Sequence, residues 1–190
     1  MVKKCEWANF NLEMEEYHDK EWGIPEHDDH KIFELLTLEG MQAGLSWNTI
    51  LKKRTNFRKA FDNFDYKKIA KYSEKKVEEL VQNEGIIRNK LKIQAVITNA
   101  NAFLKVINQF GTFDKYIWNF VKNKPIINQW KTLNEIPSKT ESSELISKDL
   151  KKRGFKFVGS TIIYAFLQAI GIINDHLIYC VYNPNKVNNT

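Results

Sequence analysis

Long uncharged apolar runs are missing from this sequence of 190 residues. The first residues, Met1 to Glu6, contain no apolar stretch that could act as a secretory signal, so we expect a cytoplasmic protein. The most apolar region, residues 155–173, is interrupted by polar residues such as Lys156 and Gln168. This region therefore fits a buried helix better than a membrane span.

Signals for β-strands are nearly absent, and the sequence contains no internal repeat and no low-complexity tail. By contrast, helix starts and stops recur along the chain, and 43% of the residues are hydrophobic. A chain of this length and composition is not disordered and can bury a core as one domain or as two small lobes. We predict an all-α fold in which an irregular connection, residues 123–141, joins two helical groups.

Acidic residues are outnumbered by basic ones. The chain has 29 Lys and Arg against 23 Asp and Glu, which gives a formal charge of +6 and an isoelectric point near 9.1. Such a balance favours polyanionic partners such as nucleic acid. Much of the lysine is expected on solvated helix faces, however, so charge alone does not distinguish a nucleic-acid-binding protein from one without an acidic partner.

Capping residues and apolar spacing predict where the helices begin and end. Asp28 or Asp29 can cap one helix, and Ser73 can cap another. Residues 89–109 carry apolar side chains at helical spacing, and Gly111 follows them as a stop signal. These residues predict one long amphipathic helix near the middle of the chain.

A carboxylate, two glycines and a tryptophan follow one another between Leu38 and Trp47. Glu39 falls on the same helical face as the apolar Ile32 and Leu35, which predicts that it is buried. Desolvation would raise the pKa of a lone carboxylate there, unless a cation or a hydrogen-bond donor meets it. The stretch therefore predicts a pocket. The alternative is that Glu39 bends out to solvent or pairs with a lysine.

The two cysteines of the chain each have a histidine nearby in sequence, Cys5 with His18 and Cys180 with His176. Two thiolates and two imidazoles form a complete tetrahedral zinc site, and with four protein ligands such a zinc is structural. The spacing of His176 and Cys180 would place both ligands on one helical face. A site built from all four residues would join the two ends of the chain. The alternatives are a disulfide, which a reducing cytosol disfavours, or core thiols beside surface histidines.

The pattern around residues 155–159 predicts two helices joined by a tight hairpin. The first helix begins at Ser142 or Ser143, and the second is capped by Ser160 or Thr161. Backbone N–H groups that open the second helix form an anion site suited to a DNA phosphate. Neutralising charges are available from Lys151, Lys152, Arg153 and Lys156. The alternative is an ordinary turn between two helices with basic residues at a helix end.

Taken together, these motifs resemble the DNA-3-methyladenine glycosylase I family, bacterial base-excision repair enzymes of the helix-hairpin-helix superfamily. The resemblance covers almost the whole chain. It is carried by Cys5-Glu6-Trp7, residues 17–23, Leu38 to Trp47, Gly85-Ile86-Ile87-Arg88, Lys151 to Gly159, and Asn174-Asp175-His176 with Cys180. It implies a helix-hairpin-helix glycosylase fold in a single domain, residues 1–190, with two helical lobes and the hairpin motif at residues 142–171.

The resemblance also implies roles for individual residues. A structural zinc would be held by Cys5, His18, His176 and Cys180. Glu39 and Tyr17 would hydrogen-bond the edge of an extruded base, Trp47 would stack on its face, and Trp7 and Trp22 would line the pocket. N3-methylation makes adenine in DNA cationic, so aromatic walls would gain cation–π attraction of about 0.5–2 kcal/mol, and the buried carboxylate would gain a positive partner.

For the DNA, the resemblance implies that Leu45 fills the gap left by the flipped base and that Gly44, Lys156, Gly159 and Ser160 contact the duplex. The positive charge weakens the glycosidic bond, so water can complete hydrolysis and leave an abasic site. We expect a monofunctional enzyme, because no lysine lies between residues 38 and 47. We also expect a monomer.

Two positions depart from the family pattern. Met14 stands where family members often have a pocket tyrosine, so the base contacts can differ in detail. The wider superfamily uses a catalytic aspartate beyond the hairpin, which the resembled family lacks; here the nearest carboxylate is Asp175, expected to orient His176 or to cap a turn. Two other functions stay open at this point, a non-catalytic zinc-stabilised DNA-binding module and a hydrolase with a catalytic zinc.

Overall fold

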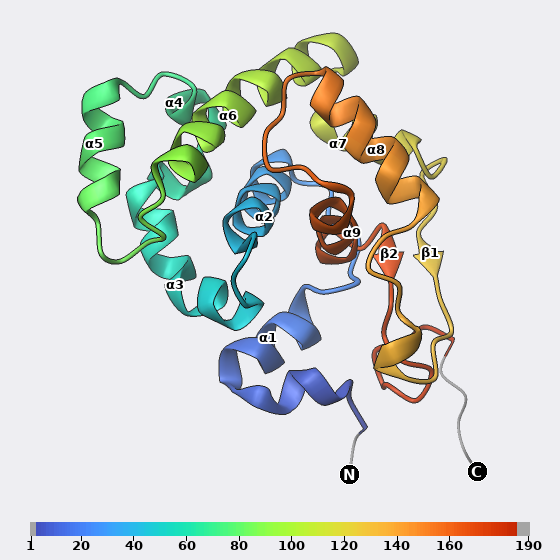
Figure 1. The fold of residues 1–190 in the computed structure, drawn as a ribbon. Helices are drawn as coiled ribbons and strands as arrows, with labels where there is room; N and C mark the ends of the chain where they lie inside the picture. Colours follow the sequence, from blue (N-terminus) through green and yellow to red (C-terminus); the bar gives the residue numbers. More distant parts are fainter. Residues whose placement is uncertain (1–2, 186–190) are drawn as a thin grey trace.

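The computed structural model describes residues 3–185 and is built mainly from α-helices (Figure 1). In chain order they are α1 (Leu12–Lys20), α2 (Asp29–Gln42), α3 (Trp47–Ala60), α4 (Tyr66–Ile69), α5 (Glu74–Gln82), α6 (Lys90–Phe110), α7 (Phe113–Asn119), α8 (Glu141–Lys152) and α9 (Ser160–Ala169). Three short 3₁₀ helices are η1 (Glu6–Phe10), η2 (Asp62–Phe64) and η3 (Leu133–Glu135). The predicted all-α class is confirmed.

The connection at residues 123–141 is more ordered than the sequence indicated. It contains a two-residue strand, β1 (Ile126–Ile127), which pairs in parallel with β2 (Ile173–Asn174). The pairing ties the connection to the C-terminal part of the chain, beside α9.

The predicted capping residues begin the helices for the expected physical reason. Asp28 and Ser73 accept hydrogen bonds from backbone N–H groups in the first turns of α2 and α5. Asn89 does the same for α6, and Gly111 ends that helix with a φ of 89°, a left-handed conformation that favours glycine. The long helix predicted at residues 89–109 is thus confirmed.

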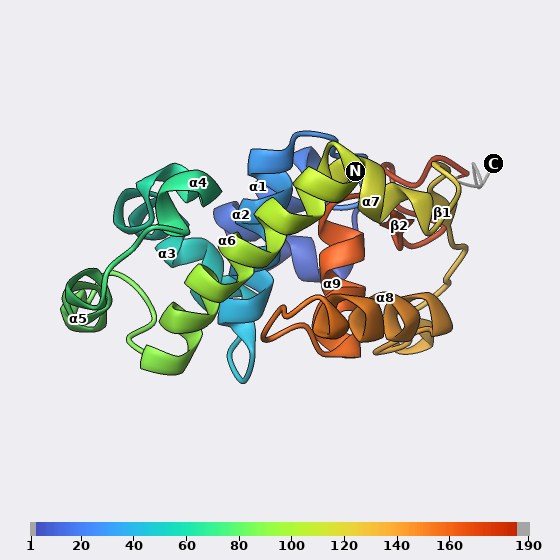
Figure 2. The same ribbon diagram turned by 90° about the horizontal axis from the view of Figure 1, so that it is seen from above.

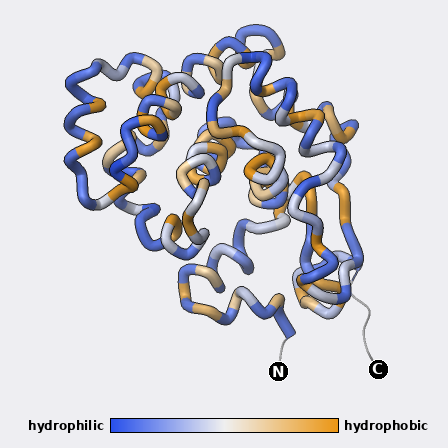
Figure 3. Tube along the Cα trace, in the orientation of Figure 1, coloured by the Kyte–Doolittle hydropathy of each residue, from blue (hydrophilic) through white to orange (hydrophobic). Residues whose placement is uncertain are grey.

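Helix α2 lies at the centre of the molecule and packs against α3, α6, α7 and α9 (Figure 1). Every residue from Ile32 to Met41 is buried, so this helix is covered on all sides over that length. Hydropathy alternates between apolar and polar along most of the surrounding helices (Figure 3), as expected for helices that bury one face each. The core therefore surrounds the helix that carries Glu39.

The two helices around the hairpin start differently from the prediction. Helix α8 is capped by Thr140, and Ser143 completes a capping box with it. Helix α9 begins after Gly159, without a side-chain cap from Ser160 or Thr161. The loop after α2 and the hairpin between α8 and α9 project from the same side of the molecule, next to the first turn of α6 (Figure 2).

Within residues 3–185, none of the helices combines the length and the apolar character needed to cross a membrane.

Candidate functional site

A cavity of about 360 Å³ opens beside the C-terminal half of α2. Side chains from η1, α1, the turn after α1, α2, α3 and α9 line it, together with two from the connection at residues 123–141. The lining residues are Trp7, Met14, Tyr17, Trp22, Glu39, Gln42, Trp47, Leu133, Ile136, Ala165 and Gln168. The structure therefore brings together five residues that the sequence assigned to a pocket, namely Trp7, Tyr17, Trp22, Glu39 and Trp47.

Glu39 is buried in the wall of this cavity and is only 3% exposed. Within the described part of the chain, its Oε2 atom has no hydrogen-bond partner. Burial raises the pKa of the carboxyl to about 8. The predicted burial is confirmed, and the alternatives of a solvent-facing carboxylate or a lysine partner are wrong. A buried carboxylate without a partner is suited to a ligand that brings positive charge or hydrogen-bond donors.

Aromatic rings form the rest of the wall. The rings of Trp7 and Trp22 meet edge to face with 4.9 Å between their centroids, and those of Tyr17 and Trp47 lie 5.1 Å apart at 55°. The Nε1 atom of Trp47 is buried without a partner among the described residues. Burial, followed by the nearby Glu39 charge, raises the pKa of Tyr17 well above its ordinary value, so its hydroxyl keeps its proton. The cavity offers flat apolar faces with a few polar atoms, which suits an aromatic ligand.

A buried ion-pair network fixes the helices that carry these side chains. Arg54 on α3 donates two hydrogen bonds to Glu21, at 2.7 and 2.8 Å, and one of 2.6 Å to Glu34 on α2. The backbone N–H groups of Glu21 and Trp22 both donate to the carbonyl of Tyr17. Arg54 therefore locks the end of α1, with two pocket aromatics, onto α2.

A second cavity, of about 390 Å³, adjoins the first and shares Glu39, Gln42 and Ala165 with it. Its other walls come from the loop after α2 and the first turns of α9. In that loop Gly44 has a φ of 78°, and Leu45 is 42% exposed although apolar. The second cavity connects the aromatic pocket to the side of the molecule where Leu45 projects.

Sequence reasoning missed several residues of the pocket. Gln42, Ala165 and Gln168 carry no local signal of their own, because a residue's place in a wall depends on which helices meet there. Leu133 and Ile136 lie in the connection that the sequence assigned only as irregular. The one available signal was the presence of apolar residues within that otherwise polar segment.

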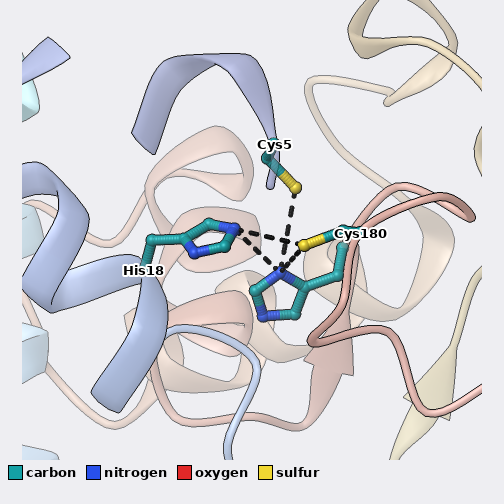
Figure 4. A group of neighbouring side chains, drawn as sticks. Cys5, His18 and Cys180 are labelled. Carbon is teal, nitrogen blue, oxygen red and sulfur yellow. Dashed lines mark hydrogen bonds between the residues drawn. The ribbon is translucent and has the colours of Figure 1, made fainter. Parts of the chain in front are cut away.

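Cys5, His18, His176 and Cys180 gather in one buried cluster, with one ligand atom of each within 4.8 Å of the others. Figure 4 shows the Cys5, His18 and Cys180 side chains pointing toward one another. Both cysteines are free and both histidines are buried, so the alternatives of a disulfide and of surface histidines are wrong. The cluster can hold a metal ion and joins the two ends of the chain.

Hydrogen bonds orient both imidazole rings of the cluster. Nδ1 of His18 lies 2.7 Å from the Asp19 carboxylate, and Nε2 of His176 lies 3.0 Å from the carbonyl of Trp22. The other nitrogen of each ring faces the sulfur of Cys180 at 3.6 Å. One expectation was wrong, because His176 and Cys180 lie in a turn after β2 rather than on a helix.

Asp175 neither lines the cavities nor orients the His176 ring. Its carboxylate is fully buried and accepts four hydrogen bonds of 2.5–2.8 Å. The donors are Asn128, Trp130, Tyr164 and Gln168. Asp175 therefore ties the connection at residues 123–141 to α9, which is a structural role and differs from the one expected.

The hairpin is held by side chains from neighbouring helices. The Asn99 amide of α6 pairs with both the N–H and the carbonyl of Lys156, at 2.7 and 3.0 Å, and Phe157 adopts a φ of 53°. The Lys156 side chain is exposed, and the surroundings of Gly159 are open. Arg153, by contrast, donates to Asp149 at 2.6 Å and stacks on nearby aromatic rings, so it is not the free cation that the sequence suggested.

Fold and site together define a helical protein with an aromatic, carboxylate-containing pocket beside an exposed hairpin. A family model described as methyladenine glycosylase matches residues 7–183. DNA-3-methyladenine glycosylase 1 of Escherichia coli is 50% identical over 185 residues, 97% of this chain and 99% of that protein. The chain belongs to the methyladenine glycosylase family.

Solved structures agree with this assignment. A crystal structure of 3-methyladenine DNA glycosylase I superposes with a TM-score of 0.92 at 50% identity, over 96% of this chain and 100% of the other. The Staphylococcus aureus enzyme, described in a study of the structural basis of 3-methyladenine recognition, superposes with a TM-score of 0.90 at 33% identity, over 98% of each chain. The resemblance seen in the sequence motifs is confirmed.

Proposed function

We propose that this protein is a base-excision repair glycosylase that hydrolyses the N-glycosidic bond of 3-methyladenine in alkylated duplex DNA. The observation that carries the proposal is the buried, unpartnered carboxylate of Glu39 in an aromatic-walled cavity. Its support is the family membership, with relatives named for this activity at 50% and 48% identity over nearly the whole chain.

Recognition of the base follows from charge and shape. N3-methylated adenine in DNA is cationic, so it supplies the positive partner that Glu39 lacks, and in this proposal the Tyr17 hydroxyl hydrogen-bonds its edge. Trp47 stacks on the base, and Trp7 and Trp22 close the pocket, with cation–π attraction of about 0.5–2 kcal/mol. Normal adenine offers no charge and leaves the carboxylate unpaired, which disfavours its binding. Met14 presents a thioether to the cavity where many family members have a hydroxyl.

The reaction is hydrolysis at the anomeric carbon. The bond between C1′ of the deoxyribose and the base nitrogen breaks, and its electron pair leaves with the base and neutralises the positive charge. The oxygen of a water molecule bonds to C1′, and this water releases one proton to solvent. The product in the DNA is an abasic site. No lysine lines either of the two cavities, so an amine nucleophile for strand cleavage is missing there. The enzyme is therefore monofunctional, and strand breaks formed without added base or heat would contradict this.

DNA is engaged from the side where the loop after α2 and the hairpin project. Leu45 enters the duplex and fills the gap left by the flipped nucleotide, while Gly44 allows the sharp turn that presents it. Residues 142–171 act as a helix-hairpin-helix motif in which Lys156, Gly159 and Ser160 contact a phosphate at the start of α9. Residues 1–190 form a single domain with two helical lobes, and the protein acts as a monomer.

The four-residue cluster fits a structural zinc ion. Metal–sulfur bonds of about 2.3 Å and metal–nitrogen bonds of about 2.0 Å at tetrahedral angles place sulfur and nitrogen about 3.5 Å apart and two nitrogens about 3.3 Å apart. The observed separations are 3.6–3.8 Å between Sγ and ring nitrogen atoms and 3.1 Å between the two ring nitrogens. The bound ion would stabilise the fold, and four protein ligands leave no position for a catalytic water, which disfavours a zinc hydrolase.

The test is the release of free bases from methylated duplex DNA, resolved by chromatography, with wild type and Glu39→Gln compared. Wild type should release 3-methyladenine, and Glu39→Gln should release it at least roughly tenfold more slowly, because the amide cannot neutralise the cationic base. Glu84→Gln removes a carboxylate from an exposed side chain and serves as the matched control. If wild type binds DNA but releases no base, the protein is a DNA-binding module and the proposal is wrong.

A further inference from the structure

Lys92, in the first turn of α6, has an ammonium group in an unusual place. The residue is only 8% exposed, and in the described part of the chain no carboxylate pairs with it. Its Nζ atom donates instead to two backbone carbonyls, those of Met41 at 2.9 Å and Ala43 at 2.6 Å. Burying an ammonium is costly, so these two hydrogen bonds must contribute enough to keep it there.

The two carbonyls lie where α2 ends and the loop that presents Leu45 begins. Ala43 already has non-helical backbone angles, and Gly44 turns the chain with a φ of 78° in open surroundings. Inside the loop itself, the N–H of Leu45 donates to the carbonyl of Gln42 at 2.6 Å. Carbonyls at a helix C-terminus carry partial negative charge, so a buried cation there is electrostatically favourable. Lys92 thus holds the loop to the body of the protein from the side of α6.

Helix α6 is a firm support for this contact. It spans 21 residues, and Asn89 caps its first turn by accepting a hydrogen bond from the backbone N–H of Lys92. Two turns further along, Asn99 holds the hairpin through Lys156. Lys92 and Asn99 are seven residues apart and lie on one face of the helix, so α6 fixes the loop and the hairpin relative to each other.

We propose that Lys92 is a positioning residue for base extrusion, which holds the loop of residues 43–46 so that Leu45 points into the DNA duplex. The inference rests on the proposed function, because it assigns the loop its use. Lys92 lines neither the aromatic cavity nor the one beside it, so it does not touch the reacting atoms. Its effect should fall on extrusion of the base from the duplex and not on the pocket that receives the base.

The experiment compares release of 3-methyladenine from methylated duplex DNA with release from the same methylated strand unpaired. A duplex requires the wedge more than a single strand does, because a base must be unpaired and unstacked and its gap filled. Lys92→Met keeps an unbranched apolar side chain as far as Cε and removes the ammonium group with its donors. Lys105→Met, on the exposed part of the same helix, is the control for loss of one positive charge. Calorimetric titration with free 3-methyladenine reports whether the pocket of each variant is intact.

The ratio of duplex to single-strand activity should fall roughly ten- to hundredfold in Lys92→Met. This is the change expected when two charge-assisted hydrogen bonds no longer stabilise the state in which the base is extruded from the duplex. Free 3-methyladenine should bind as in wild type, and Lys105→Met should keep the wild-type ratio. Leu45→Ala should lower the ratio similarly, and the double variant should be no worse than Leu45→Ala alone, because both changes remove the same wedge.

Several outcomes would overturn the proposal. They are an unchanged ratio, an equal loss on both substrates together with weakened binding of the free base, or additive losses in the double variant. Lys92→Arg keeps the charge and donors, so a ratio as low as that of Lys92→Met would also contradict it. If Lys92→Met does not fold, Lys92→Leu, which likewise has neither charge nor donors, gives the same comparison. Wild type that releases no base from either substrate would instead refute the proposed function.

Discussion

Replacement of Glu39 by glutamine should make the protein more stable, by an amount that depends on pH. The folded protein raises the pKa of this carboxyl from 4.5 to about 8 because it is buried. Between these two values the unfolded chain gives up the proton while the folded protein keeps it. The wild type therefore loses stability as pH rises from about 4.5 to about 8, and glutamine, which does not titrate, avoids this loss.

The size of the effect follows from the shift. A difference of one pKa unit is about 1.4 kcal/mol, so the loss is on the order of 3 kcal/mol at pH 7 and approaches about 5 kcal/mol above pH 8. For a protein of this length, 3 kcal/mol corresponds to a melting temperature higher by on the order of 10 °C. The unpartnered amide of glutamine reduces the gain at every pH, but it does not change the dependence on pH.

Urea denaturation of wild type and Glu39→Gln at pH 5 and pH 8.5 measures the prediction. The stability difference between the two proteins should grow in favour of Glu39→Gln between these pH values, and Glu84→Gln should show no such change. Any metal bound at the four-residue cluster contributes equally to both proteins and cancels in the comparison. If the stability difference between wild type and Glu39→Gln were the same at both pH values, the carboxyl would not be desolvated as its burial indicates.

Two further predictions concern other parts of the fold. Cys180→Ser should lower the melting temperature and abolish its response to a chelator, because a structural metal contributes folding free energy; an unchanged melting temperature would contradict a metal at this cluster. Gly171→Ala should destabilise the protein by about 3 kcal/mol or more in urea, because its φ is 68° and a Cβ atom would lie 2.2 Å from the backbone of Ile24. Gly154→Ala has a similarly positive φ but open surroundings, so it should cost only about 1 kcal/mol; equal losses in the two variants would show that the close contact is not what matters.

Local signals in the sequence determined the helices and the burial of Glu39. Capping by Asp28 and the stop at Gly111 depend on hydrogen bonds and backbone angles within a few residues, so they can be read from neighbours in the chain. The face that Glu39 shares with Ile32 and Leu35 likewise follows from the helical repeat. The candidate metal ligands were also evident, because the only two cysteines of the chain each have a histidine nearby in sequence.

Only the tertiary structure decided how these parts meet. The meeting of Cys5 and His18 with His176 and Cys180, the hydrogen bonds that Asn128 and Trp130 donate to Asp175, and the packing of Arg153 on the rings of Phe110 and Tyr116 all depend on segments distant in sequence. Nothing in the sequence distinguishes Lys92 from any other lysine near the start of a helix. Its place against the carbonyls of Met41 and Ala43 exists only because α2 and α6 cross there. Sequence patterns report which face of an element is buried, whereas the partner of a buried polar group is chosen by packing between elements.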